Sequence, residues 1–178
     1  LRVSRIESLS PTLRRIILKS ANGEPLPVAG PGAHLSLTLA SPKKVYRNSY
    51  SVVSFSGDHY ELIVRRVEDS RGGSAFVHEN LKEGDMLPST VPLNLFPIQV
   101  GSRKRLLIGG GIGVTPLLSF AKVLQESGDR FEMHQFVRED EKEVFENLVQ
   151  GVGSKNIHIH TRRPKDGEIQ ALLEEQPL

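Results

Sequence analysis

Glycines gather in residues 105–116, which read RLLIGGGIGVTP. A short apolar run at 106–108 leads into them, and Thr115-Pro116 then opens an amphipathic stretch. This order predicts a strand, a tight turn and a helix, with Thr115 as the helix cap and Pro116 in the first turn. The free N–H groups of such a helix start attract a phosphate, and glycines let that phosphate approach the backbone. We therefore expect a nucleotide to bind here.

The alternative is a strand–helix connection in which the glycines serve only close packing. The pattern departs from the G-x-G-x-x-G dinucleotide fingerprint, because Gly109 and Gly111 fit it but Val114 stands where the third glycine belongs. The density of glycines followed by Thr-Pro favours nucleotide binding over packing alone.

A second candidate site follows Arg65-Arg66 and reads SRGGS at residues 70–74. Two glycines before a predicted helix with a serine cap can form a nest of backbone N–H groups that binds an anion. Arginines on both sides add forked donors suited to phosphate. The alternative is a surface loop before a capped helix. The candidate phosphate ligands are Arg65, Arg71, Gly72, Gly73 and Ser74.

A third candidate site is the predicted strand segment RNSYS at residues 47–51. A flavin needs donors near its reactive ring edge, an aromatic neighbour and a cation for its phosphate. Arg47, Tyr50 and Ser51 supply these three types. Strand alternation places Tyr50 on the face of Asn48 and opposite Ser51. The alternative is an edge strand with ordinary polar residues facing solvent.

The elements that must position these residues fall into two groups. Many short strands at close spacing predict an antiparallel β-barrel over residues 1–98, with a short helix at 74–81 and one or two strands within 86–96. Residues 99–104 read as a linker. Alternating strands and helices then predict a parallel α/β domain over 105–178. Its expected strands are 105–108, 131–137 and 156–160, and its expected helices are 116–126, 140–150 and one that begins at 168.

Composition excludes several classes of function. The 23 Lys and Arg nearly balance the 21 Asp and Glu, which argues against nucleic acid as the main partner. With no cysteine, this stretch holds no disulfide and no cysteine-ligated iron–sulfur cluster. No apolar run is long enough to span a membrane and no signal peptide opens the chain, so we expect a cytoplasmic protein. The histidines on predicted strands show no metal-ligand spacing, and no metal site is expected: His134, His158 and His160.

In this order the three motifs resemble the ferredoxin–NADP reductase superfamily, and within it the reductase components of bacterial oxygenases, of the phthalate dioxygenase reductase type. The resemblance covers nearly the whole chain. It implies an antiparallel flavin-binding barrel followed by a nicotinamide-binding α/β domain. It also implies hydride transfer from NAD(P)H to a flavin, and then transfer of single electrons to an iron–sulfur centre or an oxygenase partner.

The resemblance also implies roles for individual residues. Tyr50 would lie along the isoalloxazine ring and Ser51 would reach its N5 region, which makes both catalytic candidates. The loop at 70–74 would cradle the flavin phosphate. The sequence DSRGGS, which begins at Asp69, resembles that of the FMN-using branch rather than that of the FAD enzymes. Thr115 would lie near the nicotinamide as a third catalytic candidate. The nicotinamide dinucleotide would be lined by Gly110, Gly111, Gly113, Val114 and Thr115.

The choice between NADH and NADPH depends on Arg138, Glu139 and Asp140, which follow the second predicted parallel strand. Carboxylates near the adenosine ribose accept hydrogen bonds from its 2′-OH and repel a 2′-phosphate, which favours NADH. Arg138 favours NADPH instead. The expected cofactors are FMN and NADH, with an iron–sulfur cluster only if a further ferredoxin domain exists.

The chain departs from the family pattern in three ways. Asn48 stands two residues before Tyr50, where the family usually has its arginine, and Arg47 comes one residue earlier. The C-terminal Cys-Gly-Pro segment is absent, and so is the cysteine-rich ferredoxin domain. The nucleotide-binding domain is therefore expected to be incomplete: either the chain is a fragment, or its end is disordered or encoded separately. Because the chain begins at Leu1 without a methionine, we also expect a few residues to be missing at the start. Two other functions stay open: a non-catalytic flavin- or nucleotide-binding regulator, and an FAD-dependent NADPH reductase.

Overall fold

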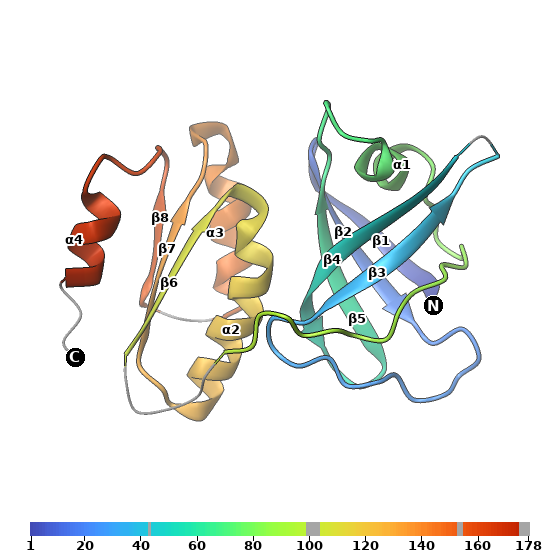
Figure 1. Ribbon diagram of the computed structural model, residues 1–178, viewed down its shortest axis with the longest axis horizontal. Helices are drawn as coiled ribbons and strands as arrows, with labels where there is room; N and C mark the ends of the chain where they lie inside the picture. Colours follow the sequence, from blue (N-terminus) through green and yellow to red (C-terminus); the bar gives the residue numbers. More distant parts are fainter. Residues whose placement is uncertain (43, 99–103, 153–154, 175–178) are drawn as a thin grey trace. The chain divides into compact units, whose positions relative to one another are not determined.

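The computed structural model describes residues 1–42, 44–98, 104–152 and 155–174. The chain divides into two compact units, Leu1–Pro97 and Ile98–Leu178 (Figure 1). Most of the expected linker, residues 99–103, lies outside the described part of the chain. Every helix in the described ranges is too short or too polar to cross a membrane.

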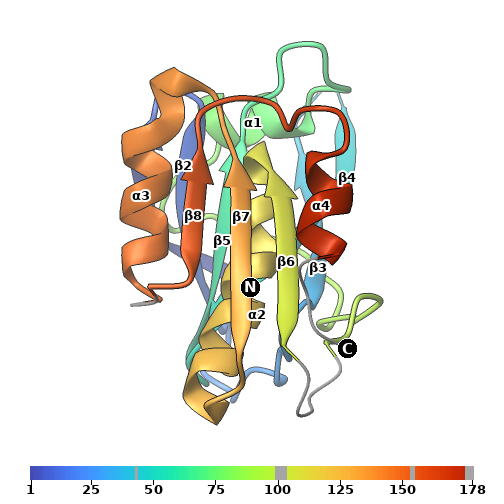
Figure 2. The same cartoon turned by 90° about the vertical axis from the view of Figure 1, so that its left-hand side faces the viewer.

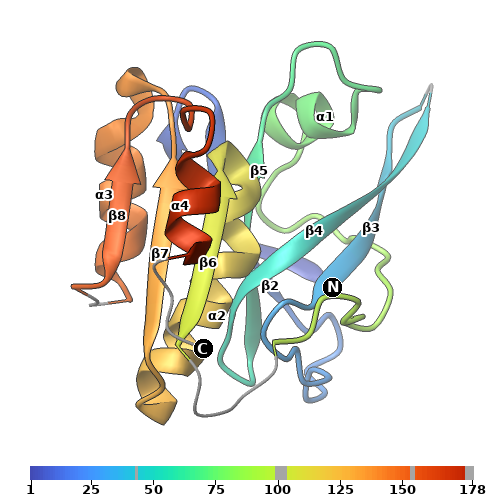
Figure 3. The same ribbon diagram turned by 60° about the vertical axis from the view of Figure 1, so that its left-hand side comes forward.

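The first unit is an antiparallel sheet of five strands in the order β1-β2-β5-β4-β3, and the long β3–β4 hairpin is seen in Figure 3. Apolar and polar residues alternate along β3, so one face of the strand forms part of the core. Leu35, Leu37 and Leu39 are almost fully buried there, and the residues between them are not. The strands are β1 (Arg2–Ser10), β2 (Leu13–Lys19), β3 (His34–Ala40), β4 (Val45–Phe55) and β5 (His59–Arg65).

The strands expected within 86–96 are wrong. This segment makes only isolated antiparallel bridges, which pair Met86 with β1 and Ser89 and Leu93 with β3. Pro88 and Pro92 have no N–H to donate, so a continuous ladder cannot form there. Because β1 and β3 are the two edges of the sheet, these bridges nevertheless help to close it into a barrel.

The short helix α1 (Gly73–Glu79) follows β5 and packs on the barrel through Val77, which is fully buried. Its His78 is also buried, and the Nε2 atom lies 3.0 Å from the carbonyl oxygen of Val64 in β5. The helix is therefore held on the strand that leads to the loop at 70–74.

The second unit is a parallel sheet in the order β6-β7-β8. The helices α2 and α3 lie on one of its faces and α4 lies on the other (Figures 1 and 2). In the first strand of this sheet Leu107 is buried, whereas Leu106 and Ile108 are only partly buried. The elements are β6 (Arg105–Gly110), α2 (Val114–Ser127), β7 (Phe131–Phe136), α3 (Lys142–Gln150), β8 (Ile157–His160) and α4 (Glu168–Glu174), with short 3-10 turns at Gly111–Gly113 and Glu139–Glu141.

Helix α2 begins two residues earlier than predicted. Val114, Leu117, Leu118 and Ala121 are buried at helical spacing, and this stripe packs against β6 and β7. The predicted fold class is confirmed: an antiparallel barrel followed by a parallel α/β unit.

Candidate functional site

The structure brings two of the sequence motifs together in the first unit. Tyr46, Asn48 and Tyr50 of β4 are partly buried, and the two residues between them, Arg47 and Ser49, are exposed. The backbone of the loop before α1 lies against Tyr46 and Asn48. A Cβ on Gly72 would come within 2.9 Å of Tyr46 Cε1, and one on Gly73 within 2.5 Å of Asn48 Oδ1. Only glycine fits this contact, which we call the β4–loop cradle.

Gly72 has a second reason to be glycine. Its φ is +104°, in a region that residues with a side chain rarely adopt. It caps α1 without any side-chain hydrogen bond. The predicted cap at Ser74 is therefore wrong, because the helix already begins at Gly73.

Ser74 instead holds the loop together. Its hydroxyl accepts a hydrogen bond from the backbone N–H of Val67 at 3.1 Å and lies 3.2 Å from the Ser70 hydroxyl. The Ser70 hydroxyl in turn accepts from the N–H of Gly72 at 3.2 Å. Ser74 is buried, so the shape of the glycine turn depends on these side chains.

Of the cations near these motifs, Lys44 lies at the β4–loop cradle and Arg47 does not. Lys44 donates from Nζ to the carbonyl oxygen of Arg71 at 3.1 Å, and its Nζ lies 5.1 Å from the centre of the Tyr46 ring. Sequence reasoning missed this cation because it stands in a turn before the strand. Arg65 is partly buried at the end of β5. Arg47 lies on the strand face opposite to Asn48, so the structure does not bring it to the glycines.

Tyr50 carries a buried polar atom. Its hydroxyl makes no hydrogen bond of normal geometry to any of the described residues. Burial raises the pKa of Tyr50 to about 12, and the nearby Asn48 side chain offsets part of that rise. A buried donor without a partner costs free energy, so a ligand that accepts a hydrogen bond there would relieve this cost. Ser51, on the opposite face, is partly buried and pairs in register with His34.

In the second unit, the glycines between β6 and α2 differ in their surroundings. A Cβ on Gly109 would come within 2.5 Å of Gln135 Oε1 and 2.7 Å of Leu117 Cδ1, so this glycine is needed for packing. A Cβ on Gly110 or Gly113 would meet no atom within 4 Å. Close packing therefore explains Gly109 but not Gly110 or Gly113.

The predicted cap at Thr115 is also wrong. Gly113 precedes the helix, and the Thr115 hydroxyl donates to the carbonyl oxygen of Ile112 at 3.0 Å. Gln135 of β7 is a residue that sequence reasoning missed. It is fully buried, and its Nε2 donates to the carbonyl oxygen of Gly111 at 2.7 Å, which braces the turn.

The acidic turn after β7 engages Arg138. Its Nε lies 3.4 Å from Asp140 Oδ1, and its Nη2 lies 3.3 Å from Glu141 Oε1. Glu141 is buried, whereas Arg138 and Asp140 are exposed. The guanidinium is therefore paired within its own turn.

Comparison with known proteins places the chain among its relatives. No family model matches it. It is 38% identical over 161 residues to the carnitine monooxygenase reductase subunit of Escherichia coli K12, an alignment that covers 89% of this chain and 50% of that protein. It is 34% identical over 177 residues to the vanillate O-demethylase oxidoreductase of Acinetobacter baylyi, covering 97% of this chain and 55% of that protein.

The chain is a homologue of oxygenase reductase components. Phthalate dioxygenase reductase, described as a modular structure for electron transfer from pyridine nucleotides to 2Fe-2S, superposes with a TM-score of 0.84 at 27% identity. The match covers 99% of this chain and 56% of that one. The resemblance found in the sequence is thereby confirmed.

This reductase homologue has a ferredoxin reductase-like fold, and proteins of that family bind a flavin and a pyridine nucleotide. Its named homologues are oxidoreductases. The chain spans about half the length of the curated relatives it matches.

Proposed function

We propose that this chain is the flavin- and nicotinamide-binding part of an oxygenase reductase. It would pass electrons from NADH through FMN to an iron–sulfur centre or an oxygenase partner. The observation that carries the proposal is the β4–loop cradle, in which Gly72 and Gly73 lie against Tyr46 and Asn48. It joins the two motifs that the flavin site requires, in a chain whose homologues are oxygenase reductase components.

The barrel unit would hold the flavin. The glycine backbone at 72–73 and the start of α1 would face its phosphate, with cations from Lys44, Arg65 and Arg71. Tyr50, whose buried hydroxyl makes no hydrogen bond of normal geometry to a described residue, would contact the ring, and Ser51 would donate to its reactive edge. When bound, the flavin supplies the hydride and single-electron chemistry, and these residues bind and orient it.

FMN is favoured over FAD because the loop sequence DSRGGS, residues 69–74, resembles that of the FMN-using branch. Ser70 and Ser74 already hold the glycine turn through their own hydrogen bonds. Arg47 points away from this loop, so we assign it no role in binding the flavin phosphate.

The α/β unit would bind the nicotinamide dinucleotide at the turn between β6 and α2. Gly110 and Gly113 leave open space where a Cβ would stand, which would let a phosphate approach the backbone of this turn. The lining residues would be Gly110, Gly111, Gly113, Val114 and Thr115.

NADH is favoured over NADPH by the turn that follows β7. Arg138 already pairs with Asp140 and Glu141, so its charge is partly neutralised where an adenosine ribose would lie. The exposed carboxylate of Asp140 would repel a 2′-phosphate and accept hydrogen bonds from a 2′-OH.

One experiment tests the proposal. The purified chain is mixed with FMN or FAD, the bound flavin is identified, and NADH is added without oxygen. We expect FMN to bind and its visible absorption to bleach. Failure to take up either flavin would contradict the flavin site. A bound flavin that NADH does not bleach would favour the non-catalytic regulator, and bleaching by NADPH with bound FAD would favour the other alternative.

A further inference from the structure

The face of the parallel sheet opposite α2 and α3 carries a group of histidines that the proposed function does not use. Glu132 and His134 stand two residues apart on β7, and His158 and His160 do so on β8. The parallel register pairs His134 with His158 and Phe136 with His160. Side chains two apart on a strand share a face, so all four residues project from the same side.

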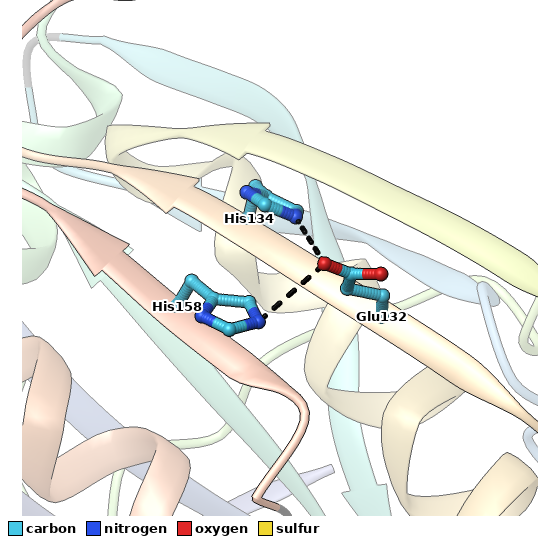
Figure 4. A group of neighbouring side chains, drawn as sticks. All are labelled: Glu132, His134 and His158. Atoms are coloured by element: carbon cyan, nitrogen blue, oxygen red, sulfur yellow. Dashed lines mark hydrogen bonds and ion pairs between the residues drawn. The ribbon is translucent and has the colours of Figure 1, made fainter. Parts of the chain in front are cut away.

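Three of these residues direct donor atoms toward one point (Figure 4). Glu132 Oε1 lies 3.0 Å from His134 Nε2 and 3.5 Å from His158 Nε2, and the three donor atoms all lie within 4.8 Å of one another. Donors held about 2.0–2.1 Å from a tetrahedral ion are roughly 3.3–3.4 Å apart. The three atoms therefore need only small shifts to surround a single ion.

The neighbours of this group already orient it. Lys104 pairs with the other carboxylate oxygen of Glu132, Oε2, which leaves Oε1 toward the imidazoles. The Nδ1 atom of His134 lies 3.0 Å from His160 Nε2. Glu132 Oε1 can only accept a hydrogen bond, so without an ion the contact at 3.0 Å places the imidazole hydrogen of His134 on Nε2. A metal ion at Nε2 would displace that hydrogen, and Nδ1 would then be the nitrogen that donates, toward His160, as the second ring nitrogen of a metal-bound histidine does.

Burial differs across the group in a way that suits an ion entering from solvent. The His134 side chain is only 7% exposed, whereas that of His158 is 48% exposed. The rings of His134 and His158 stack with centres 4.8 Å apart, which limits their movement. One ligand is thus fixed in the sheet and another stands at the surface.

We propose that Glu132, His134 and His158 bind one divalent transition-metal ion such as Zn²⁺, with His160 as a positioning residue. Two imidazole nitrogens and one carboxylate oxygen suit Zn²⁺, whereas Mg²⁺ and Ca²⁺ prefer oxygen ligands alone. The fourth position would be open to water. The ion would join β7 to β8 in addition to their ladder. None of its residues is among those proposed to hold the flavin or the nucleotide.

The test measures Zn²⁺ binding to the chelator-treated chain, without flavin, by isothermal titration calorimetry in a buffer that does not coordinate metal. We expect one Zn²⁺ per chain, with binding weakened at least tenfold by Glu132→Gln and by His158→Gln. His59→Gln is the matched control. His59 Nδ1 also contacts a carboxylate, at 2.7 Å from Asp58 Oδ1, but this is a contact of one histidine with one carboxylate and not a group of three ligands. The affinity of His59→Gln for Zn²⁺ should equal that of the unmodified chain.

Two further readouts keep the proposal falsifiable. Co²⁺ should give the visible d–d bands of a low-symmetry site in the unmodified chain and not in His158→Gln. Zn²⁺ should raise the melting temperature of the unmodified chain and not that of His158→Gln, which removes a half-exposed side chain and leaves the core intact. Absence of one-to-one binding, or equal affinity in His158→Gln, would overturn the site.

Discussion

The backbone of Gly73 lies directly against the side chain of Asn48, so closely that a Cβ on the glycine would come within 2.5 Å of Asn48 Oδ1. The contact joins the start of α1 to the middle of β4. It fixes the position of the glycine turn relative to Tyr50, the strand's next inward-facing residue. The glycine turn and the Tyr50 ring contact proposed for a flavin thus lie on one face of β4, and Ser51 lies on the other.

Gly73→Ala should displace the turn and lower FMN affinity at least tenfold, because its new methyl group collides with the Asn48 amide. Quenching of FMN fluorescence on binding measures the affinity. Gly30→Ala is the control, since its Cβ would stay 3.8 Å from the nearest atom, Asn94 Nδ2. Equal FMN affinity in the two variants would argue against the cradle as the flavin site.

Gly109→Ala and Gly110→Ala should separate packing from nucleotide binding. The first inserts a methyl group between Gln135 and Leu117, and we expect it to destabilise the second unit by about 1–3 kcal/mol. The second meets open space, so unfolding in urea should be unchanged while NADH affinity falls. If Gly110→Ala binds NADH normally, the nucleotide does not approach the backbone there.

Ser51→Ala should leave FMN bound but slow its reduction by NADH at least tenfold, because a donor to the reactive ring edge is lost. Stopped-flow absorbance without oxygen gives the rate. Ser49→Ala is the control on the same strand face, where the hydroxyl lies 2.8 Å from that of Ser36. An unchanged rate in Ser51→Ala would remove this residue from the reaction.

Asp140→Ala should narrow the preference for NADH over NADPH several-fold. It removes a carboxylate that would repel the 2′-phosphate, and it releases one of the partners of Arg138. The ratio of kcat/KM for the two nucleotides is the measurement. Glu143→Ala, an exposed carboxylate on α3, should leave that ratio unchanged. A ratio insensitive to Asp140→Ala would place the ribose elsewhere.

The barrel should lose stability in mild acid through His78. Burial lowers the pKa of this imidazole in the folded state, helped by the charges of Arg14 and Arg66. The unfolded chain takes up a proton near the ordinary pKa of about 6.5 and the folded chain only at lower pH, so stability falls as the pH drops through that window. Urea unfolding at about pH 7.5 and about pH 5.5 should show the difference. His78→Gln should flatten this dependence, and an equally steep loss in that variant would assign it to other groups.

Local periodicity was enough to predict the class of fold. Alternation at 34–39 marked a strand with one buried face, and the glycines followed by a helical apolar stripe marked the turn between β6 and α2. The same alternation correctly placed Tyr50 and Asn48 on one face of β4. These features depend only on which side of a strand or helix each residue occupies. The spacing of apolar residues along the chain is enough to predict that side.

Tertiary structure decided which residues meet. Both predicted helix caps failed because the capping residue lies two positions earlier in each case: Gly72 rather than Ser74, and Gly113 rather than Thr115. The contact of Gly73 with Asn48, the brace from Gln135 to Gly111 and the meeting of Glu132 with His158 all join segments distant in sequence. Strand register and the packing of helices on the sheet set these distances, and no spacing within a single segment encodes them.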